Sequence, residues 1–333
     1  MPNRLIFSSK FPVRYDLDKR TFDIDIQYDL SNITGKLAEE FRRNGLLTYL
    51  LDHQPAMANN WGSTENYTNI SEFYQQRLDV YHQLLLELNK VDIFPFIFKG
   101  LNNLDLYNNI VRDFKDLDIV CEKMDSFSDL AHKLSALGWS YDRSPTFWGK
   151  FDEDYLTTFW SHPNFPHFSD KEKIQLEIHV SGFPAGEVYF NRLDKGFYVD
   201  SVKKEYRDAT FSSFSLKNAL LLFLSNSSAR NWAFRVRDEY ELLFYFNSFS
   251  LKELDSIFSC KDWVIPNPIP ADFEFYLEVP TCLKEKVNLF IQKFTFKKKR
   301  YQIENFFHNL RVRADEYSLA HKLPHIHKYC HNL

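Results

Sequence analysis

A short apolar run that ends at a lysine and a glycine constrains the fold of this chain most. The run Phe94–Phe98 is followed directly by Lys99 and Gly100. An apolar run of this length next to a glycine is typical of a strand buried in a sheet that helices cover. The segment Leu117–Cys121 has the same character. The pattern therefore predicts two strands of one covered sheet, joined by a connection that begins with a glycine turn.

The segments on either side divide the chain into three expected regions. Apolar and polar residues alternate over the first 30 positions, which predicts short strands, and helical periodicity begins after them. We expect an N-terminal β/helical region over 1–66, an α/β domain over 67–214 and a helical C-terminal domain over 215–333. The expected fold class is therefore α+β (α/β), with a mixed sheet flanked by helices.

Apolar residues at helical spacing and polar caps predict the main helices. The clearest helix runs over Thr68–Lys90, with Ser71 as its cap, and Ser215 caps the first helix of the C-terminal region. The last predicted helix is Tyr301–Val312. Three prolines within Ile265–Pro270 predict a linker or hinge between helices.

Composition narrows the class of protein and its partners. The chain has 333 residues, 44% of them hydrophobic and 26% charged, as in an ordinary soluble protein. A net charge of −4 argues against general nucleic-acid binding, so we expect no nucleic-acid partner. The four cysteines have no paired spacing and therefore predict neither a disulfide framework nor a zinc site. No signal-peptide run and no apolar stretch of roughly 20 residues is seen, so we expect a cytoplasmic protein without a membrane partner.

Two carboxylates on the second strand and one on a later strand predict a metal site. Asp116 and Asp118 are two residues apart, so a strand places both side chains on one face. Glu177, within a third predicted strand, is the candidate third carboxylate. Paired carboxylates can hold two divalent ions about 3.5–4 Å apart for phosphoryl chemistry. The ligand type suits Mg²⁺, or Mn²⁺ in its place.

The Asp-x-Asp spacing by itself carries little information, because it recurs elsewhere in the chain. The other pairs are Asp16 with Asp18, Asp23 with Asp25, and Asp152 with Asp154. The pair at 116 and 118 differs from these because a strand and a Lys-Gly turn precede it.

Three residues near the first strand are candidate phosphate contacts. Gly100 stands between a predicted strand and a predicted helix, where backbone N–H groups can bind phosphate oxygens; the alternative is an ordinary turn. Lys99 offers a point charge to a phosphate, or it is a solvated or ion-paired lysine. Arg112 could bind a phosphate bidentately, or pair with Asp113.

His179 lies two residues after Glu177 and thus on the same strand face. It is a candidate metal neighbour, phosphate contact or general base, with a purely structural histidine as the alternative. The C-terminal segment also holds four histidines beside Cys330. Their spacing fits no closed tetrahedral site, so we expect an exposed tail there rather than a transition-metal site.

Taken in order, these residues resemble an uncharacterised nucleotidyltransferase family found in many bacterial polysaccharide and peptide natural-product clusters, within the polymerase-β-like nucleotidyltransferase superfamily. The resemblance covers roughly residues 70–245 and implies a nucleotidyltransferase-like fold. It implies Asp116, Asp118 and Glu177 as catalytic metal ligands. The matching elements of the pattern are Phe96–Gly100, Tyr107, Arg112, Asp116-Leu117-Asp118-Ile119 and Glu177-Ile178-His179. Lys99, Gly100, Arg112 and His179 are then the expected nucleotide-binding residues.

The expected function is Mg²⁺-dependent transfer of a nucleoside monophosphate from an NTP, with ATP as the expected donor. The acceptor would be a hydroxyl, phosphate or carboxylate on a small molecule, peptide or protein. Two alternatives stay open: a non-catalytic nucleotide-binding scaffold, and a kinase-like γ-phosphoryl transfer on the same fold. The sequence assigns neither the acceptor nor the oligomeric state.

Overall fold

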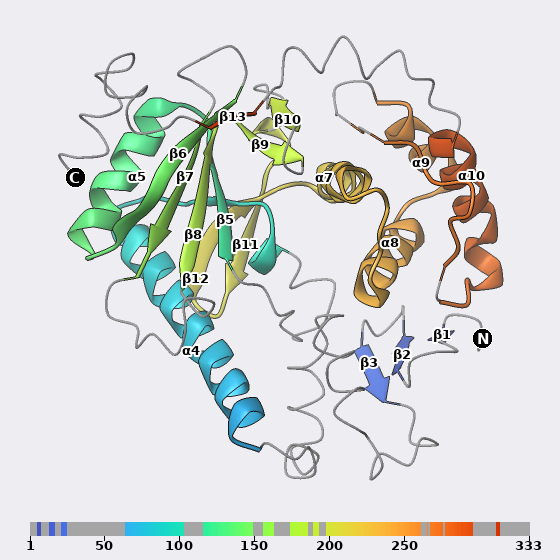
Figure 1. Cartoon of the computed structure of the whole chain (residues 1–333), viewed down its shortest axis with the longest axis horizontal. Helices are drawn as coiled ribbons and strands as arrows, with labels where there is room; N and C mark the ends of the chain where they lie inside the picture. The colour runs from blue at the N-terminus through green and yellow to red at the C-terminus, as the bar shows by residue number, and fades with distance from the viewer. Residues whose placement is uncertain are drawn as a thin grey trace. The chain divides into compact units, whose positions relative to one another are not determined.

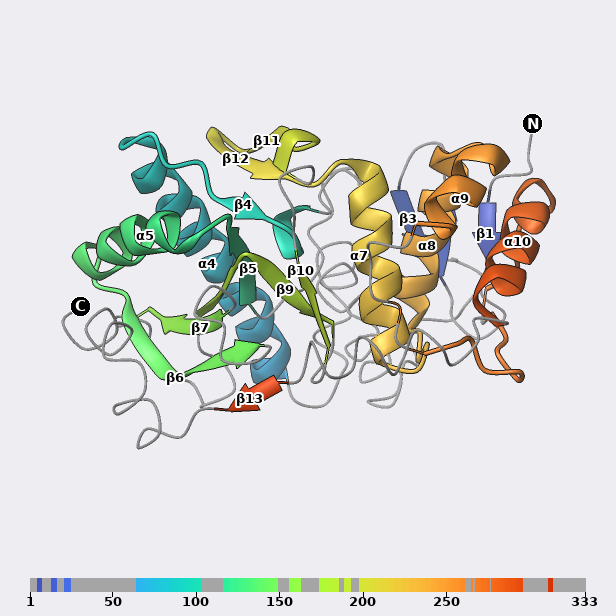
Figure 2. The ribbon, with the colours of Figure 1, turned by 90° about the horizontal axis from the view of Figure 1, so that it is seen from above.

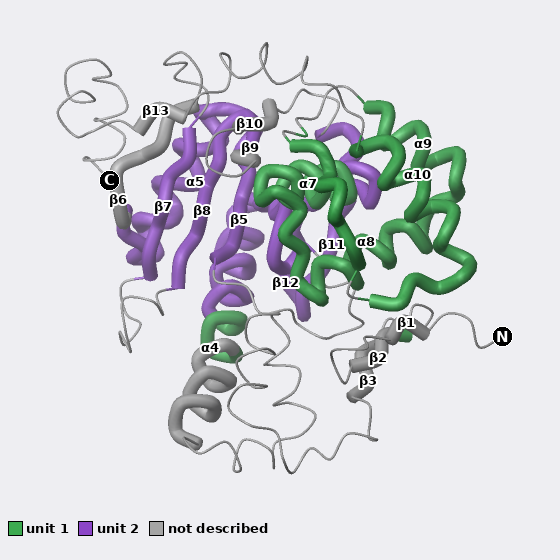
Figure 3. The backbone as a smooth tube through the Cα atoms, turned by 45° about the vertical axis from the view of Figure 1, so that its right-hand side comes forward, with its two compact units in different colours: residues 1–79, 103–114, 219–297 green, residues 80–102, 115–218, 298–333 purple. Residues whose placement is uncertain are grey.

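Segments far apart in the sequence come together in two units of the computed structural model (Figure 3). Unit 1 consists of Met1–Asp79, Asn103–Phe114 and Ala219–Lys297, and unit 2 of Val80–Asn102, Lys115–Asn218 and Lys298–Leu333. The structure describes residues 5–7, 13–16, 21–24, 64–102, 116–148, 156–162, 174–185, 189–192, 198–260, 265, 267–275, 277–295 and 311–313. The three regions expected from the sequence stay a prediction.

Unit 2 is built around an eight-stranded mixed sheet, counted over the described residues (Figure 1). The strand order is β11-β12-β4-β5-β8-β7-β6-β13, with parallel pairing between β12 and β4 and between β5 and β8. The expected mixed sheet flanked by helices is confirmed. The strands are β4 (Phe96–Ile97), β5 (Asp116–Cys121), β6 (Ser140–Trp148), β7 (Leu156–Ser161), β8 (Gln175–Val180), β11 (Val202–Tyr206), β12 (Ala209–Ser213) and β13 (Arg311–Arg313).

Two of the described helices pack against this sheet (Figure 2). Helix α5 (Met124–Ala136) buries Phe127, Leu130, Ala131 and Leu134. Helix α4 (Thr64–Asn89) begins in unit 1 and ends in unit 2, where the Tyr81 hydroxyl donates to the Gln175 carbonyl at 2.8 Å. A separate hairpin joins β9 (Gly182–Ala185) to β10 (Tyr189–Arg192). The predicted αβ layering around the central strands is therefore present.

The predicted start of α4 was wrong. The helix begins at Thr64 rather than Thr68, so Ser71 lies inside the helix and cannot be its N-cap. The segment Thr64–Asn66 is polar but contains neither glycine nor proline. A polar segment of that kind can extend a helix whose apolar face is fixed further along.

Unit 1 combines helices with a small antiparallel sheet of β1 (Leu5–Phe7), β2 (Val13–Asp16) and β3 (Thr21–Ile24), which confirms the early strands. Its helices are α7 (Leu216–Ala229, which begins in unit 2), α8 (Val236–Ser248), α9 (Leu251–Phe258), η3 (Thr281–Leu283) and α10 (Lys284–Thr295). The predicted cap of α7 is confirmed, since the Asn218 N–H donates to Ser215 Oγ at 3.4 Å. Helix α9 begins with a capping box between Ser250 and Glu253.

The proline-rich segment at 265–270 is anchored within unit 1. Asn267 N donates to Ser228 Oγ at 2.7 Å, and Trp232 Nε1 donates to the Asn267 carbonyl at 3.0 Å. The Trp232 ring also packs against Phe290 and Phe294. These contacts tie the predicted linker or hinge to the end of α7 and to the aromatic core of the unit.

The last predicted helix was also wrong where the structure describes it. Arg311 and Val312 belong to β13, which pairs antiparallel with β6 and places Val312 opposite Phe147. Alternation of charged and apolar residues in the sequence suits a strand at the edge of a sheet. Periodicity alone could not show that partner strand, because it lies far away in the sequence.

None of the helices within the described ranges is long and apolar enough to cross a membrane.

Candidate functional site

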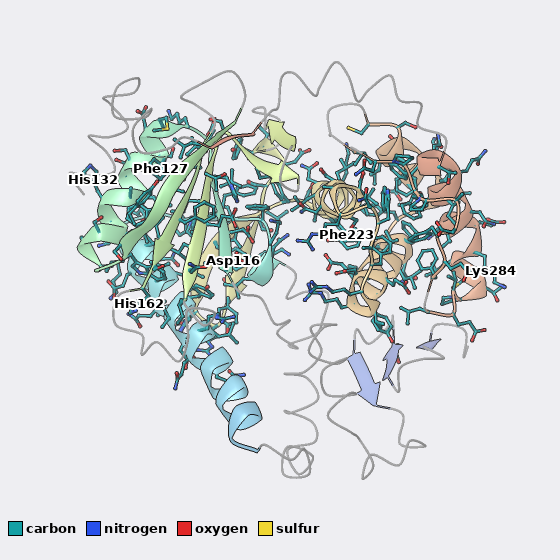
Figure 4. All side chains as sticks on the ribbon, viewed as in Figure 1. Asp116, Phe127, His132, His162, Phe223 and Lys284 are labelled. Atoms are coloured by element: carbon teal, nitrogen blue, oxygen red, sulfur yellow. The ribbon has the colours of Figure 1, made fainter. Side chains whose placement is uncertain are left out.

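Strands β5 and β8 bring the predicted carboxylates together. Their parallel register places Asp118 directly opposite Glu177 and Asp116 opposite Gln175. Since paired residues on neighbouring strands point to the same face, Asp116, Asp118 and Glu177 share one face of the sheet. Asp116 lies at the start of β5 (Figure 4). The alternating residues Leu117 and Ile119 are fully buried on the other face and hold the strand in place.

Three side chains on this face have ligand atoms close enough to share one metal ion. One atom each from Asp118, Glu177 and His179 lies within 4.8 Å of the others, and within the described ranges this is the one such group. Asp116 is not a member of it. The structure therefore places the ring nitrogen of His179 beside two of the carboxylates that the sequence predicts as metal ligands.

His179 is buried completely, and its two ring nitrogens have different surroundings. Nδ1 lies 2.8 Å from Thr157 Oγ1 on β7. Nε2 lies 3.7 Å from Asp118 Oδ1 and 3.7 Å from Glu177 Oε1. Nε2 has no hydrogen-bond partner among the described residues. The ring packs edge-on against Phe98, with 5.2 Å between centroids, so one nitrogen is fixed and the other points at two carboxylates.

The Lys-Gly turn supplies a positive charge to the same face. Gly100 has a φ of 63°, in the left-handed region that glycine adopts without strain. Just before it, Lys99 Nζ lies 3.2 Å from Asp118 Oδ1 and 4.7 Å from the centroid of the Phe98 ring. Lys99 is therefore ion-paired, which is the alternative that the sequence left open. Its side chain is 33% exposed, so it can also reach a bound anion.

The surroundings shift the pKa values of the groups on this face in opposite directions. Burial, with the nearby charges of Asp118 and Glu177, raises the pKa of Asp116 to about 7. Burial alone would also raise the pKa of Asp118, but the Lys99 ammonium beside it more than offsets burial and holds that pKa below its ordinary value. Burial lowers the pKa of His179, so its ring is neutral near pH 7. A neutral imidazole beside an ionised carboxylate is the protonation state that binds a metal ion.

Several predicted residues lie outside the described residues, and one contact was not predicted. Arg112, Tyr107 and the C-terminal histidines are not described. Thr157 was missed. It comes to His179 through the antiparallel register of β7 and β8, which pairs these two residues directly. A strand threonine gives no signal of its own, so only knowledge of that register could have identified it.

Comparison with known proteins identifies the family of this chain. Residues 37–256 match a family described as uncharacterised nucleotidyltransferase, and this stretch includes every predicted site residue. A solved structure of an H. pylori protein assigned as a nucleotidyltransferase aligns at 13% identity, with a TM-score of 0.34. That alignment covers 66% of this chain and 96% of the other. A comparison with curated proteins gave no match. Because the matched stretch covers more than half of the sequence, the chain belongs to the uncharacterised nucleotidyltransferase family.

Proposed function

We propose that this protein is a divalent-metal-dependent enzyme that transfers a nucleoside monophosphate from an NTP, with ATP as the first donor to test, to an acceptor. The observation that carries the proposal is the pairing of Asp118 with Glu177 on adjacent parallel strands, with their ligand atoms and that of His179 within 4.8 Å. Family membership supplies the reaction class.

The residues present fit a divalent cation. Carboxylate oxygens and a neutral imidazole are both common ligands of such ions, and Nε2 of His179 lacks a hydrogen-bond partner among the described residues. Asp118 and Glu177 would bind the ion. Asp116 remains a predicted ligand, because its carboxyl shares the face and would lose its proton as the neighbouring charges were neutralised. When bound, the ion would neutralise charge that develops on the α-phosphate.

Other residues of the same face would position the nucleotide. Lys99 is paired with Asp118 at 3.2 Å, and a cation on that carboxylate would compete with the ammonium. Lys99 would then turn to a phosphate oxygen as a point charge. Gly100, in its left-handed turn, lets the backbone approach a phosphate without a side chain between them. Arg112 is the remaining predicted phosphate contact.

The test measures pyrophosphate release from each of the four NTPs with Mg²⁺ or Mn²⁺, in the presence of mixed acceptors and of the protein itself as acceptor. Asp118→Asn should reduce the rate at least about 100-fold, the loss typical for one electrostatic contact to a transition state. The Asp-x-Asp pair at Asp23 and Asp25 provides the matched control, so Asp23→Asn should leave the rate unchanged.

Three outcomes would contradict the proposal. An Asp118→Asn variant with full NTP turnover would remove Asp118 from the reaction. Release of ADP instead of pyrophosphate would assign γ-phosphoryl transfer. Calorimetric binding of a metal–NTP complex without turnover in any acceptor mixture would favour the scaffold alternative.

A further inference from the structure

A fully buried histidine whose second nitrogen faces two carboxylates calls for a physical explanation. His179 is 0% exposed, and Nε2 has no hydrogen-bond partner among the described residues. Leaving a buried polar atom without a hydrogen-bond partner lowers stability, and native proteins rarely do so. The position of this atom, 3.7 Å from an oxygen of each carboxylate, suggests which partner it lacks.

Neither neutral tautomer of His179 is satisfied by the protein alone. If Nε2 carries the proton, the carboxylate oxygens at 3.7 Å are too distant to accept a proper hydrogen bond. If Nε2 carries the lone pair, that lone pair faces two negatively charged groups and is repelled by them. A cation between Nε2 and the two oxygens resolves both problems, because all three atoms then donate electron pairs to it.

Thr157 allows the ring to change tautomer without losing its hydrogen bond. Its hydroxyl lies 2.8 Å from Nδ1 and can either donate or accept. When Nε2 ligates a metal, the proton must be on Nδ1, and Oγ1 of Thr157 can accept the hydrogen bond from Nδ1–H. Partners of this kind fix the ring of a ligating histidine and are part of the metal site.

We propose that His179 Nε2 completes a mixed nitrogen–oxygen metal site with Asp118 and Glu177. The site selects a first-row transition ion such as Mn²⁺ over Mg²⁺, and Thr157 positions the imidazole. Mg²⁺ prefers oxygen ligands and keeps several waters, whereas imidazole nitrogen suits transition ions. The inference rests on the proposed function only in that the carboxylates bind a divalent cation. It replaces Mg²⁺ as the expected ion and gives His179 a role as metal ligand rather than nucleotide contact.

The experiment measures metal binding directly, without turnover. Mn²⁺ binding to the full chain is followed by electron paramagnetic resonance, and Mg²⁺ affinity is obtained by competition. Wild type should bind Mn²⁺ at least about tenfold more tightly than Mg²⁺, and its spin-echo spectrum should contain the ¹⁴N modulation of a coordinated imidazole. His179→Gln should lose this modulation and about 10–100-fold of Mn²⁺ affinity, while Mg²⁺ affinity changes little.

The Thr157 variants provide the matched control and do not depend on the folding of His179→Gln. Thr157→Val keeps the shape but removes the hydroxyl, and it should lower Mn²⁺ affinity by about tenfold. Thr157→Ser restores the hydroxyl and should restore the affinity. A loss in both variants would indicate a packing effect and would overturn the positioning role.

The remaining outcomes separate this inference from the proposed function. Bound Mn²⁺ without ¹⁴N modulation in wild type, or equal affinity for Mn²⁺ and Mg²⁺, would overturn the mixed site and leave carboxylate-based nucleotidyl transfer standing. Wild type that binds neither ion, with or without ATP, would overturn both. In the expected case Asp118→Asn loses affinity for both ions, whereas His179→Gln loses affinity for Mn²⁺ alone.

Discussion

Two buried carboxylates, one in each unit, differ in what surrounds them. In unit 1, Glu239 on α8 is 0% exposed and accepts a hydrogen bond from the Leu277 backbone N–H at 2.9 Å. In unit 2, Asp118 is 4% exposed and faces Glu177 across a parallel strand pair, with Lys99 as its ion-pair partner. The Glu239 carboxylate thus provides a hydrogen-bond acceptor for the backbone at Leu277. Asp118 sits among like charges, which the fold alone gives no reason to collect.

The difference shows that burial of a charge does not by itself mark a functional site. A buried carboxylate that satisfies a backbone donor stabilises the fold. Carboxylates held side by side repel one another and reduce stability unless a cation is present. A substitution at the unit 2 site should therefore lower activity without lowering stability, whereas a substitution of Glu239 should lower stability.

The largest expected effect is at the unit 2 site. Glu177→Gln should lower NTP turnover by about 100–1000-fold, because it removes a predicted metal ligand. The free energy of unfolding of the metal-free protein should stay the same or rise, since the change removes a like charge beside Asp118. Steady-state turnover and urea denaturation in EDTA test the two halves. A variant that loses stability without losing turnover would make Glu177 a structural residue like Glu239.

The next effect is the reverse one, in unit 1. Glu239→Ala should lower the free energy of unfolding by about 2–4 kcal/mol, because the buried Leu277 N–H loses its acceptor. Glu239→Gln keeps an acceptor oxygen and should cost clearly less. Mn²⁺ affinity of the folded variants should stay within about twofold of wild type. Equal losses for Ala and Gln would show that the charge of Glu239, rather than its hydrogen bond, is what matters.

The same contrast explains how much of the site the sequence could predict. Side chains in a strand alternate between its two faces, so the sequence predicted that Asp116 and Asp118 lie on one face. Gly100 predicted the turn that places Lys99. Those are local properties, read within a few residues. The pairing of Asp118 with Glu177 needed one further assumption, that their strands are neighbours, and the register confirms it.

What could not be predicted depends on register between distant strands. Thr157 meets His179 only because β7 and β8 pair as they do across a connecting segment, and β13 joins the sheet from near the end of the chain. Neither pairing leaves a mark in local periodicity. The membership of His179 in the ligand group instead of Asp116 is also a matter of a few ångströms in side-chain placement, which residue spacing does not determine.

The last expected effect concerns how stability depends on pH through Asp116. Its pKa is raised from 3.8 to about 7 in the folded protein, chiefly by burial and then by Asp118 and Glu177. Between these values the folded state holds a proton that the unfolded state has lost, so stability falls as the pH rises. The contribution of Asp116 is therefore complete below about pH 4 and gone above about pH 7.

The Asn variant isolates that contribution. Asp116→Asn has no carboxyl to ionise, so the stability of wild type relative to this variant should fall by about 3 kcal/mol between about pH 4 and about pH 7 in EDTA. Urea denaturation at several pH values measures the difference. With saturating Mn²⁺ the slope should disappear, because a cation stabilises the ionised carboxylate as well. A slope that Mn²⁺ leaves unchanged would mean that Asp116 is buried beside the metal site without belonging to it.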